Sequence, residues 1–525
     1  MKQRKPVRRF LGSLSAILSF VAVSSVSAQM PGYPAPRYPQ IPDITSVEQL
    51  MPNARYVISK PGDKSANLRV GFGVQGNERV LFLSYDTTDP LVVEALRRAF
   101  TEKGAQVDIL TLPRGEMYWQ GNVDGTNEVR YPTLLEELKI KDPTAVARRE
   151  ADNRALQDFI LARKYDLVVG PAARVGDRDP YVSTWMPWMN REQLALTYAP
   201  TFPEEVANAA DRKGWDIIRQ AKSIRFTDPE GTDMQWTWFP SYWQVVEGTH
   251  PEYKTVGGGP AVGPVAGYIY GRGSSEDPLI PGHLMGVPLG VVLRESDGEG
   301  VIVGTANHAG PFPRLELQVK NHEITRISGG GEYGRLWKEY QEKYKDVKYP
   351  LFPRAGHTFL IECSIGTNPK VVRPYNVMEG PIAKFSWVDE RRRSGIVHWG
   401  IGTILRENQD WAEQHDHGAT HFHVHQYFPT LEATLQDGKV VRIIDKGRLT
   451  ALDDPQIRQL AAKYGDPDQL LREDWIPAIP GINVPGDYRK DYAEDPYKWI
   501  TEEHRKADPE ALRRFQQRGY DDIYK

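Results

Sequence analysis

The chain has 525 residues, with 66 Lys and Arg against 69 Asp and Glu, so its formal net charge at pH 7 is −3. Because the charges are interspersed rather than gathered in runs, the sequence carries no signature of a protein that binds nucleic acid or anionic membranes. The expected partner is a small molecule or a peptide substrate. Cys363 is the only cysteine, so no intrachain disulfide can form. The length predicts two or three domains.

The first 28 residues are typical of a cleavable signal peptide. Basic residues from Lys2 to Arg9 precede an apolar stretch, and Val26-Ser27-Ala28 fits a small-x-small cleavage site. That stretch is shorter than the roughly 20 residues a membrane span needs, and no later segment is apolar and long enough to span a bilayer. We therefore expect a secreted or periplasmic protein whose mature chain begins near Gln29. The Arg8-Arg9 pair leaves twin-arginine export open.

Four segments follow the signal peptide. Residues 29–64 are rich in proline and predict an extended linker. In residues 65–225, apolar runs such as Val80–Tyr85 alternate with segments whose apolar residues recur at helical spacing. Strands that alternate with helices predict an α/β domain with a mainly parallel sheet. In residues 226–480 glycine and proline become frequent and short alternating runs replace long helices, so an α+β metal-site domain with antiparallel hairpins is expected. Residues 481–525 are expected to form a helical tail on the surface.

Two segments of the second domain share a pattern. Phe312-Pro313-Arg314-Leu315-Glu316 and Phe428-Pro429-Thr430-Leu431-Glu432 are each followed by a polar turn and a second alternating run. Each pattern predicts a β-hairpin. The similar spacing suggests a duplicated structural element.

Five of the twelve histidines lie in one short run that ends at His425. On a strand, alternation places His421, His423 and His425 on one face, with Phe422 and Val424 on the other. Imidazoles at this spacing can converge on a cation, and a metal that needs neutral imidazole removes their mutual repulsion. The alternatives are a solvated histidine face or an adventitious tract. The apolar opposite face favours metal.

Two further motifs each place one polar residue in an apolar run. The first is His398, within Gly395–Gly402, and the second is Glu362, within Phe359–Asn368. A lone buried histidine is more often a hydrogen-bonded core residue than a ligand of a metal ion. A buried carboxylate is unfavourable unless it binds metal or forms an ion pair, for which Arg354 or Lys370 are candidates. Neither motif would suffice alone.

Together the motifs resemble the aminopeptidase T family of metallo-aminopeptidases. That family carries Leu-Gly-Glu-x-Ala-Leu-Gly-x-Asn, then Gly-x-x-His-Ile-Ala-Leu-Gly, then Ser-x-x-His-x-Asp. Here the matching stretches are Leu360–Asn368, Gly395–Gly402 and Ala419–His423, in the same order. Ile224–Asp233 resembles the family's Gly-Thr-Asp strand entry, and Gly330-Gly331-Glu332 its Gly-Glu turn. The resemblance spans about residues 65 to 445.

The resemblance implies a metal centre that contains Glu362, His398 and His421. His423 stands where the family has an aspartate, and is expected to be a fourth ligand or a hydrogen-bond donor behind the ligands. The candidate catalytic residues are Glu362 and Glu332, which would move a proton.

Two departures from the family pattern bear on the number of metal ions. The family's first metal glutamate belongs to an Asn-x-Pro-x-x-Glu-Val pattern, whereas the matching stretch here, Gly286–Val292, has no carboxylate. Where the family has a tyrosine beyond the first His, this chain has Leu405 or one of its neighbours. Two neighbouring dications need carboxylates to offset their repulsion, so we expect one divalent ion, Fe²⁺, Zn²⁺ or Co²⁺. Single histidines usually form hydrogen bonds in loops, as expected for His283 and His308. The roles of His415, His417 and His425 stay open.

Three functions are compatible with these residues, and the resemblance together with the expected export favours the first of them. The first is a metal-dependent hydrolase of the aminopeptidase type, in which metal-activated water attacks a peptide or amide. The second is a mononuclear non-haem Fe(II) dioxygenase that cleaves a hydroxylated aromatic or pyridine ring, as a related branch containing 2,5-dihydroxypyridine dioxygenases does. The third is a non-catalytic relative that binds a metal or another ligand. The oligomeric state, including a homodimer, stays open.

Overall fold

The computed structural model describes most of the chain after residue 31. The predicted signal peptide therefore lies outside the described residues. Those residues are 32–59, 72–86, 88–112, 154–170, 182–185, 190–197, 200–237, 239–241, 251, 283–285, 297–307, 310–350, 352–373, 390–403, 411, 415, 417 and 421–518.

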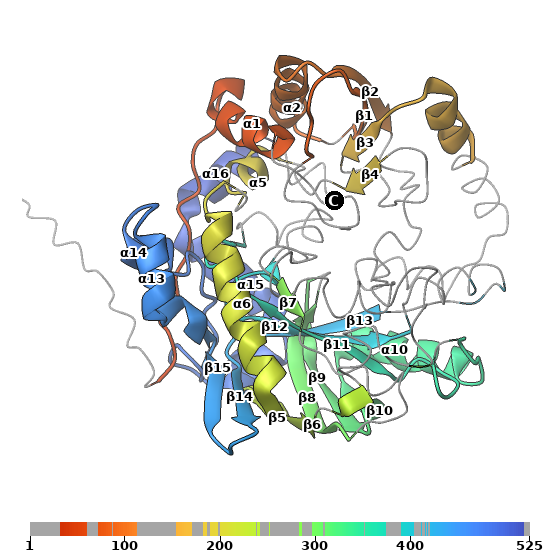
Figure 1. Cartoon of the computed structure of the whole chain (residues 1–525), viewed down its shortest axis with the longest axis vertical. Helices are drawn as coiled ribbons and strands as arrows, with labels where there is room; N and C mark the ends of the chain where they lie inside the picture. Colours follow the sequence, from red (N-terminus) through yellow and green to blue (C-terminus); the bar gives the residue numbers. More distant parts are fainter. Residues whose placement is uncertain are drawn as a thin grey trace, which may run out of the picture.

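The N-terminal part contains a four-stranded sheet in which every neighbouring pair is parallel (Figure 1). Its strands, in the order β2-β1-β3-β4, are β1 (Arg79–Tyr85), β2 (Gln106–Leu112), β3 (Leu167–Gly170) and β4 (Val182–Trp185). Helix α2 (Pro90–Glu102) begins after Asp89, whose carboxylate accepts a hydrogen bond from Leu91 N. It packs on the side of the sheet formed by Val80 and Phe82. The predicted α/β arrangement with a parallel sheet is confirmed.

The structure corrects the predicted linker. Residues Met51–Ser59 form helix α1, which follows a short 3-10 helix, Val47–Gln49. Leu50, Val57 and Ile58 are fully buried in the same core as α2. Their spacing of seven and eight residues brings them to one helix face, so this segment is part of the folded N-terminal core.

The second part of the chain forms an eight-stranded sheet, in the order β10-β9-β8-β6-β5-β14-β15-β16. Both predicted hairpins are present, as β9 with β10 and as β14 with β15. They lie in different halves of this one sheet, and the expectation of antiparallel hairpins is confirmed. The strands are β5 (Ala221–Thr227), β6 (Asp233–Thr237), β8 (Glu299–Asn307), β9 (Gly310–Lys320), β10 (Glu323–Gly329), β14 (Thr430–Leu435), β15 (Val440–Asp445) and β16 (Arg448–Leu449).

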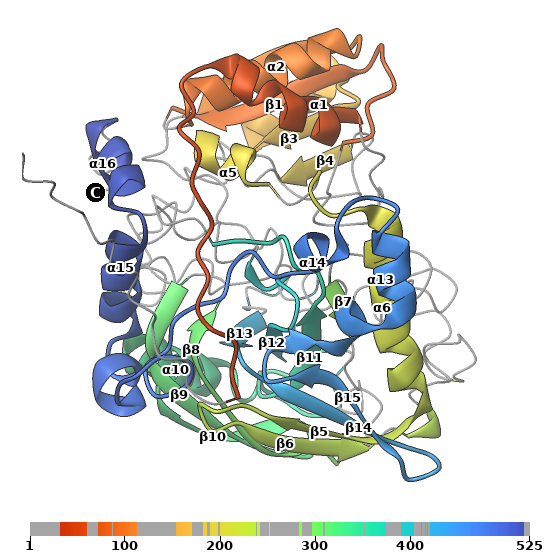
Figure 2. The ribbon, with the colours of Figure 1, turned by 90° about the vertical axis from the view of Figure 1, so that its left-hand side faces the viewer.

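A smaller antiparallel sheet, in the order β13-β12-β11-β7, packs on the eight-stranded sheet (Figure 2). The Trp399 ring lies 5.0 Å from that of Phe226 and 5.8 Å from that of Trp236, so aromatic edges join the two layers. Helix α10 (Gly331–Tyr344) stacks Trp337 on Phe422 at 4.6 Å. The strands of this sheet are β7 (His283–Met285), β11 (Leu360–Gly366), β12 (Val397–Gly402) and β13 (His421–Gln426).

The C-terminal residues connect the two parts. Figure 2 shows α15 (Pro496–Ala507) and α16 (Pro509–Gln517) rising from the sheets towards the N-terminal part. Ala511 of α16 is fully buried in a cluster with Leu81 of β1, and Arg514 donates a 2.9 Å hydrogen bond to the Ile41 carbonyl. The tail is therefore helical, as expected, and its inner face is part of the fold. The helices before it are α13 (Pro455–Ala461) and α14 (Pro467–Leu470).

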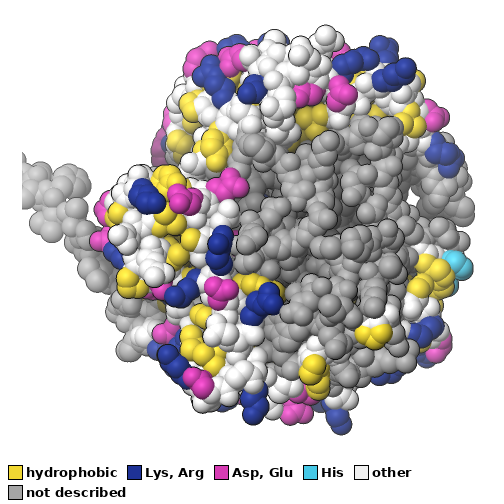
Figure 3. All heavy atoms as spheres, in the orientation of Figure 1, with side chains coloured by type: hydrophobic (Ala, Val, Ile, Leu, Met, Phe, Trp, Pro, Cys, Tyr) yellow, Lys and Arg dark blue, Asp and Glu magenta, His cyan; other side chains and the backbone are white. Residues whose placement is uncertain are grey.

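The described surface carries charges of both signs side by side. In Figure 3, Lys and Arg side chains are interspersed with Asp and Glu over the coloured part of the visible face. Within the described residues, no helix is long and apolar enough to cross a membrane.

Asp211 is a buried carboxyl group in the long helix α6 (Glu204–Gln220), at 1% exposure. Burial raises the pKa of Asp211 to about 7, and the neighbouring Thr367 hydroxyl lowers it by less. A carboxyl group whose folded pKa is raised stabilises the fold fully below its unfolded pKa, and this stability is lost as the pH rises towards the folded pKa.

We therefore expect Asp211→Asn to gain stability over wild type between about pH 4 and about pH 7, because the amide stays neutral. The gain should reach on the order of a few kcal/mol, since one pKa unit corresponds to about 1.4 kcal/mol. Urea unfolding of both proteins across this range measures it. Parallel pH profiles for the two proteins would contradict the assignment.

Candidate metal centre

The centre begins with a row of three residues across the small sheet. Glu362 of β11 pairs with Gly400 of β12, and Gly400 pairs with His423 of β13. Because adjacent strands are about 4.8 Å apart, Glu362 and His423 start roughly 10 Å apart. Gly400 has no side chain, so the space above the central strand stays open for them to approach. A glycine inside an apolar strand often marks such a close approach.

A second row lies two residues along the same strands. Ser364, His398 and His425 are register partners on β11, β12 and β13. Since side chains alternate along a strand, both rows share one face of the sheet. The opposite face carries Cys363, Trp399 and other apolar residues that pack against the eight-stranded sheet. The same three strands therefore supply both the core and the polar cluster.

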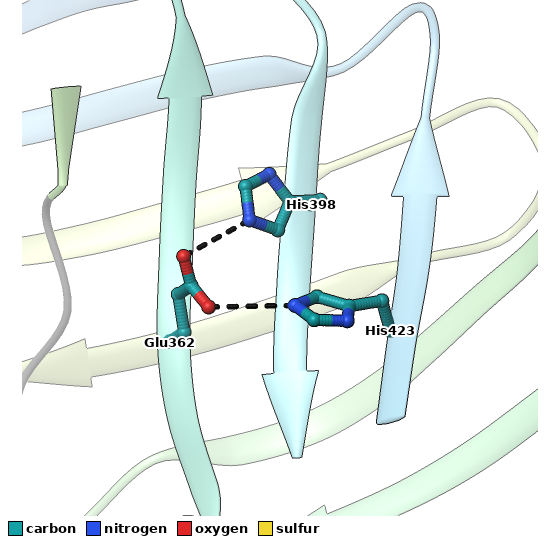
Figure 4. Close-up of side chains that lie close together, drawn as sticks. All are labelled: Glu362, His398 and His423. Carbon is teal, nitrogen blue, oxygen red and sulfur yellow. Dashed lines mark hydrogen bonds and ion pairs between the residues drawn. The ribbon is translucent and has the colours of Figure 1, made fainter. Parts of the chain in front are cut away.

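Glu362 lies between the two imidazoles (Figure 4). Its Oε1 is 3.0 Å from His398 Nε2, and its Oε2 is 3.5 Å from His423 Nε2. The three potential ligand atoms all lie within 4.8 Å of one another. Ser364 donates a 2.7 Å hydrogen bond from Oγ to Glu362 Oε1, which helps to orient the carboxylate.

Burial determines the charge of the cluster. His398 and His423 are at most 1% exposed, and Glu362 is 6% exposed. Burial lowers the pKa of His398 to about 4, although the Glu362 carboxylate raises it in part, and burial lowers the pKa of His423 well below its usual value. Both imidazoles are therefore neutral at pH 7, which is the form that binds a metal. Two imidazole nitrogens and one carboxylate suit a single divalent transition-metal ion.

His425 is anchored beside this cluster rather than within it. Its Nδ1 lies 2.8 Å from Glu390 Oε1, which also accepts a 2.8 Å hydrogen bond from the Tyr427 hydroxyl. The Arg373 guanidinium donates to Glu390 Oε2 and, at 2.7 Å, to the Tyr427 oxygen. All four residues are at most 1% exposed. Glu390 thus has its charge matched by Arg373, and it fixes the orientation of the His425 ring.

Three of the four predicted ligands come together, namely Glu362, His398 and His423. His421 lies on β13 opposite Gly402, and its side chain is outside the described residues. His423 is thus adjacent to Glu362 itself, closer than the position behind the ligands that the resemblance allowed. The strand register decides whether His423 lies beside Glu362 or behind the ligands. A sequence pattern of alternating histidines cannot decide this.

Glu332 lies elsewhere. It is in the first turn of α10, where both of its oxygens lie 2.6 Å from the Arg335 guanidinium and its side chain is 40% exposed. Ion pairs three residues apart are common on exposed helix faces. Within the described residues Glu332 is not part of the metal cluster, so its catalytic role stays a prediction that these contacts do not support.

The remaining histidines are local features where they are described. The exposed His415 ring stacks on Trp411 at 4.4 Å, with Nδ1 2.7 Å from the Trp411 carbonyl. The His417 ring lies 5.5 Å from Trp411 and 6.3 Å from Tyr344. His283 lies on β7 opposite Gly366, but its side chain and all of His308 are outside the described residues.

Gly400 offers a test of the geometry that leaves the ligands in place. Gly400→Val should put a branched side chain between Glu362 and His423 and weaken binding of Zn²⁺ or Fe²⁺ by at least roughly tenfold, because second-sphere changes typically cost 10–100-fold. Valine favours strands, so the sheet should persist. Ile401→Val, on the opposite face of the same strand, is the matched control. Equal metal affinity of Gly400→Val and this control in equilibrium dialysis would refute the arrangement.

The chain was compared with known proteins. No family model and no curated protein matches it. Its structure is similar, at low sequence identity, to two solved structures. One is 2,5-dihydroxypyridine dioxygenase from Pseudomonas putida KT2440, with 17% identity over 77% of this chain and 98% of that chain, at a TM-score of 0.38. The other is AmpT from Thermus thermophilus, with 14% identity over 77% of this chain and 99% of that chain, at a TM-score of 0.37.

Proposed function

We propose that this chain is a mononuclear metal-dependent enzyme in which Glu362, His398 and His423 hold one divalent ion. The observation that carries this proposal is the convergence of one carboxylate and two neutral imidazoles within 4.8 Å in a buried site. A buried carboxylate is costly unless a positive partner compensates it. Two neutral imidazole nitrogens and one carboxylate oxygen are a donor set that suits a divalent cation, and the charge of that ion compensates the carboxylate.

The donor set allows two kinds of chemistry. An ion held by two histidines and one glutamate would supply Lewis acidity and open coordination positions, for a water nucleophile in hydrolysis or for a hydroxylated aromatic substrate in oxidative ring cleavage. Hydrolysis and ring cleavage differ in whether a further carboxylate, outside the ligand set, is present to transfer a proton.

The described residues favour ring cleavage. A hydrolase of the aminopeptidase type would use a carboxylate outside the ligand set to move the proton, and the cluster contains only one carboxylate among the described residues. Glu390 is held by Arg373 and Tyr427, and Glu332 is paired with Arg335. We therefore propose an Fe(II)-dependent dioxygenase acting on a hydroxylated aromatic or pyridine ring, with an amide or peptide hydrolase as the second candidate.

Metal reloading tests this proposal. Protein purified without oxygen, stripped with chelator and reloaded should bind one Fe²⁺ per chain and consume O₂ with 2,5-dihydroxypyridine or catechol as probe. His398→Ala and His423→Ala should lose metal and activity together, because each removes one of three ligands. His415→Ala, at an exposed position, is the control and should keep both. Two tightly bound Zn²⁺ ions with aminopeptidase activity on leucine p-nitroanilide, and no O₂ uptake, would reject the oxygenase.

We also propose that the protein is exported. The support is the basic, apolar and small-residue order before Gln29. Protein isolated from the periplasm or medium of its host should begin near residue 29, which N-terminal sequencing would establish. A chain that keeps Met1 and stays in the cytoplasm would exclude export.

A further inference from the structure

A second buried acidic pair lies far along the chain from the metal centre, in the turn between β5 and β6. Asp228 is 7% exposed and Glu230 is 4% exposed. Asp228 Oδ1 accepts a 2.9 Å hydrogen bond from Glu230 N, and Asp228 N donates a 3.0 Å hydrogen bond to the Thr232 carbonyl. The turn therefore holds both carboxyl groups in place, and neither is used by the proposed function.

The C-terminal segment contacts this pair through hydroxyl groups. Tyr488 donates a hydrogen bond of 3.1 Å to Glu230 Oε1, and Thr305 of β8 donates one of 2.9 Å to the same oxygen. The Tyr492 oxygen lies 3.2 Å from Thr305 Oγ1. Tyr488 and Tyr492 both belong to the helical turn Tyr488–Ala493. Glu230 thus joins the eight-stranded sheet, called the central sheet below, to the start of the C-terminal helices.

The other two carboxyl oxygens, Asp228 Oδ2 and Glu230 Oε2, are buried without a hydrogen-bond partner among the described residues. A buried carboxylate oxygen without a hydrogen-bond partner is strongly unfavourable when the group is ionised. At least one of the two groups therefore needs a proton for the packed arrangement to be stable.

Among the described residues, few charged groups face the pair from the surrounding elements. Arg314 of β9 directs its guanidinium to the Glu230 carbonyl at 3.4 Å and to the Glu316 carboxylate at 3.2 Å. Burial raises the pKa of Tyr33, from the N-terminal segment, and the charges of Asp228 and Asp445 raise it further, so both carboxylates are near this ring. Burial raises the pKa of Asp228, and burial together with the Asp228 charge raises the pKa of Glu230, which Arg314 opposes only in part.

We propose that the Asp228 and Glu230 pair is a pH-sensitive latch that fastens the C-terminal strap, residues 488–517, to the central sheet. The strap then continues through α15 and α16 to the N-terminal part, where Ala511 and Arg514 make their contacts (Figure 2). The latch is closed while the pair keeps a proton. Ionisation of both carboxyl groups loosens the base of the strap.

The direction in which pH changes the stability of the closed latch follows from the raised pKa values of the pair. Closed-state stability is fully present below the ordinary carboxyl pKa of about 4 and is lost as the pH rises towards the higher folded values. Opening that releases one proton should become on the order of tenfold more frequent per pH unit in that window.

Hydrogen exchange at the amides of residues 488–493, corrected for the intrinsic pH dependence of exchange, measures this opening. In wild type, corrected exchange should rise roughly tenfold per unit between about pH 5 and about pH 7. The double variant Asp228→Asn/Glu230→Gln should flatten this slope, since neither amide titrates, whereas each single variant keeps one buried carboxyl group and retains part of the slope. Asp211→Asn removes a buried carboxyl group elsewhere, so it should leave the slope of the strap unchanged.

Tyr488→Phe keeps the proposal testable if either acidic variant fails to fold. It removes one hydroxyl from Glu230 but keeps the carboxyl pair, so exchange should increase at every pH with the slope retained. Equal slopes in wild type and the double variant Asp228→Asn/Glu230→Gln would overturn the latch. So would Ca²⁺ restoring full protection at about pH 8 in wild type, because the pair would then hold a cation instead of a proton.

Discussion

A carboxylate held out of water between two neutral imidazoles is the constraint on which the proposed centre depends. Glu362 can occupy that place because Gly400 leaves the middle strand bare between it and His423. Ser364 adds one hydrogen bond, which orients the carboxylate but supplies no charge. The site is therefore arranged for a cation, and its geometry follows from strand register rather than from loops.

The register is in turn secured by the opposite face of the sheet. Trp399 precedes Gly400 and packs edge-on against Phe226 and Trp236, so the strand cannot slide without losing aromatic contacts of the core. A shift by one residue would move Trp399 to the polar face and His398 into the core. The register of β12 thus sets both the core packing of Trp399 and the position of His398, so a change in one affects the other.

Local patterns in the sequence were enough to predict several features. Alternation predicted that His423 and Phe422 lie on opposite faces, and the Phe-Pro segments predicted both hairpins. Pairing between distant strands was not predictable, because nothing local to His421 or His423 states which one faces Glu362. The surroundings of Glu332 were more accessible from the sequence, because its partner Arg335 is only three residues away and ion pairs at this spacing are local.

The charges around the proposed centre also bear on what it would bind. Glu390 is neutralised by Arg373, so Glu362 is the one carboxylate of the described cluster left to offset a divalent ion. One positive charge of a divalent ion is then not offset by this cluster. In a medium of low dielectric such a site favours a ligand that arrives as an anion or becomes one on binding. A hydroxylated ring that binds as its phenolate meets that requirement, whereas a neutral amide does not. This electrostatic argument agrees with the argument from the single carboxylate of the described cluster.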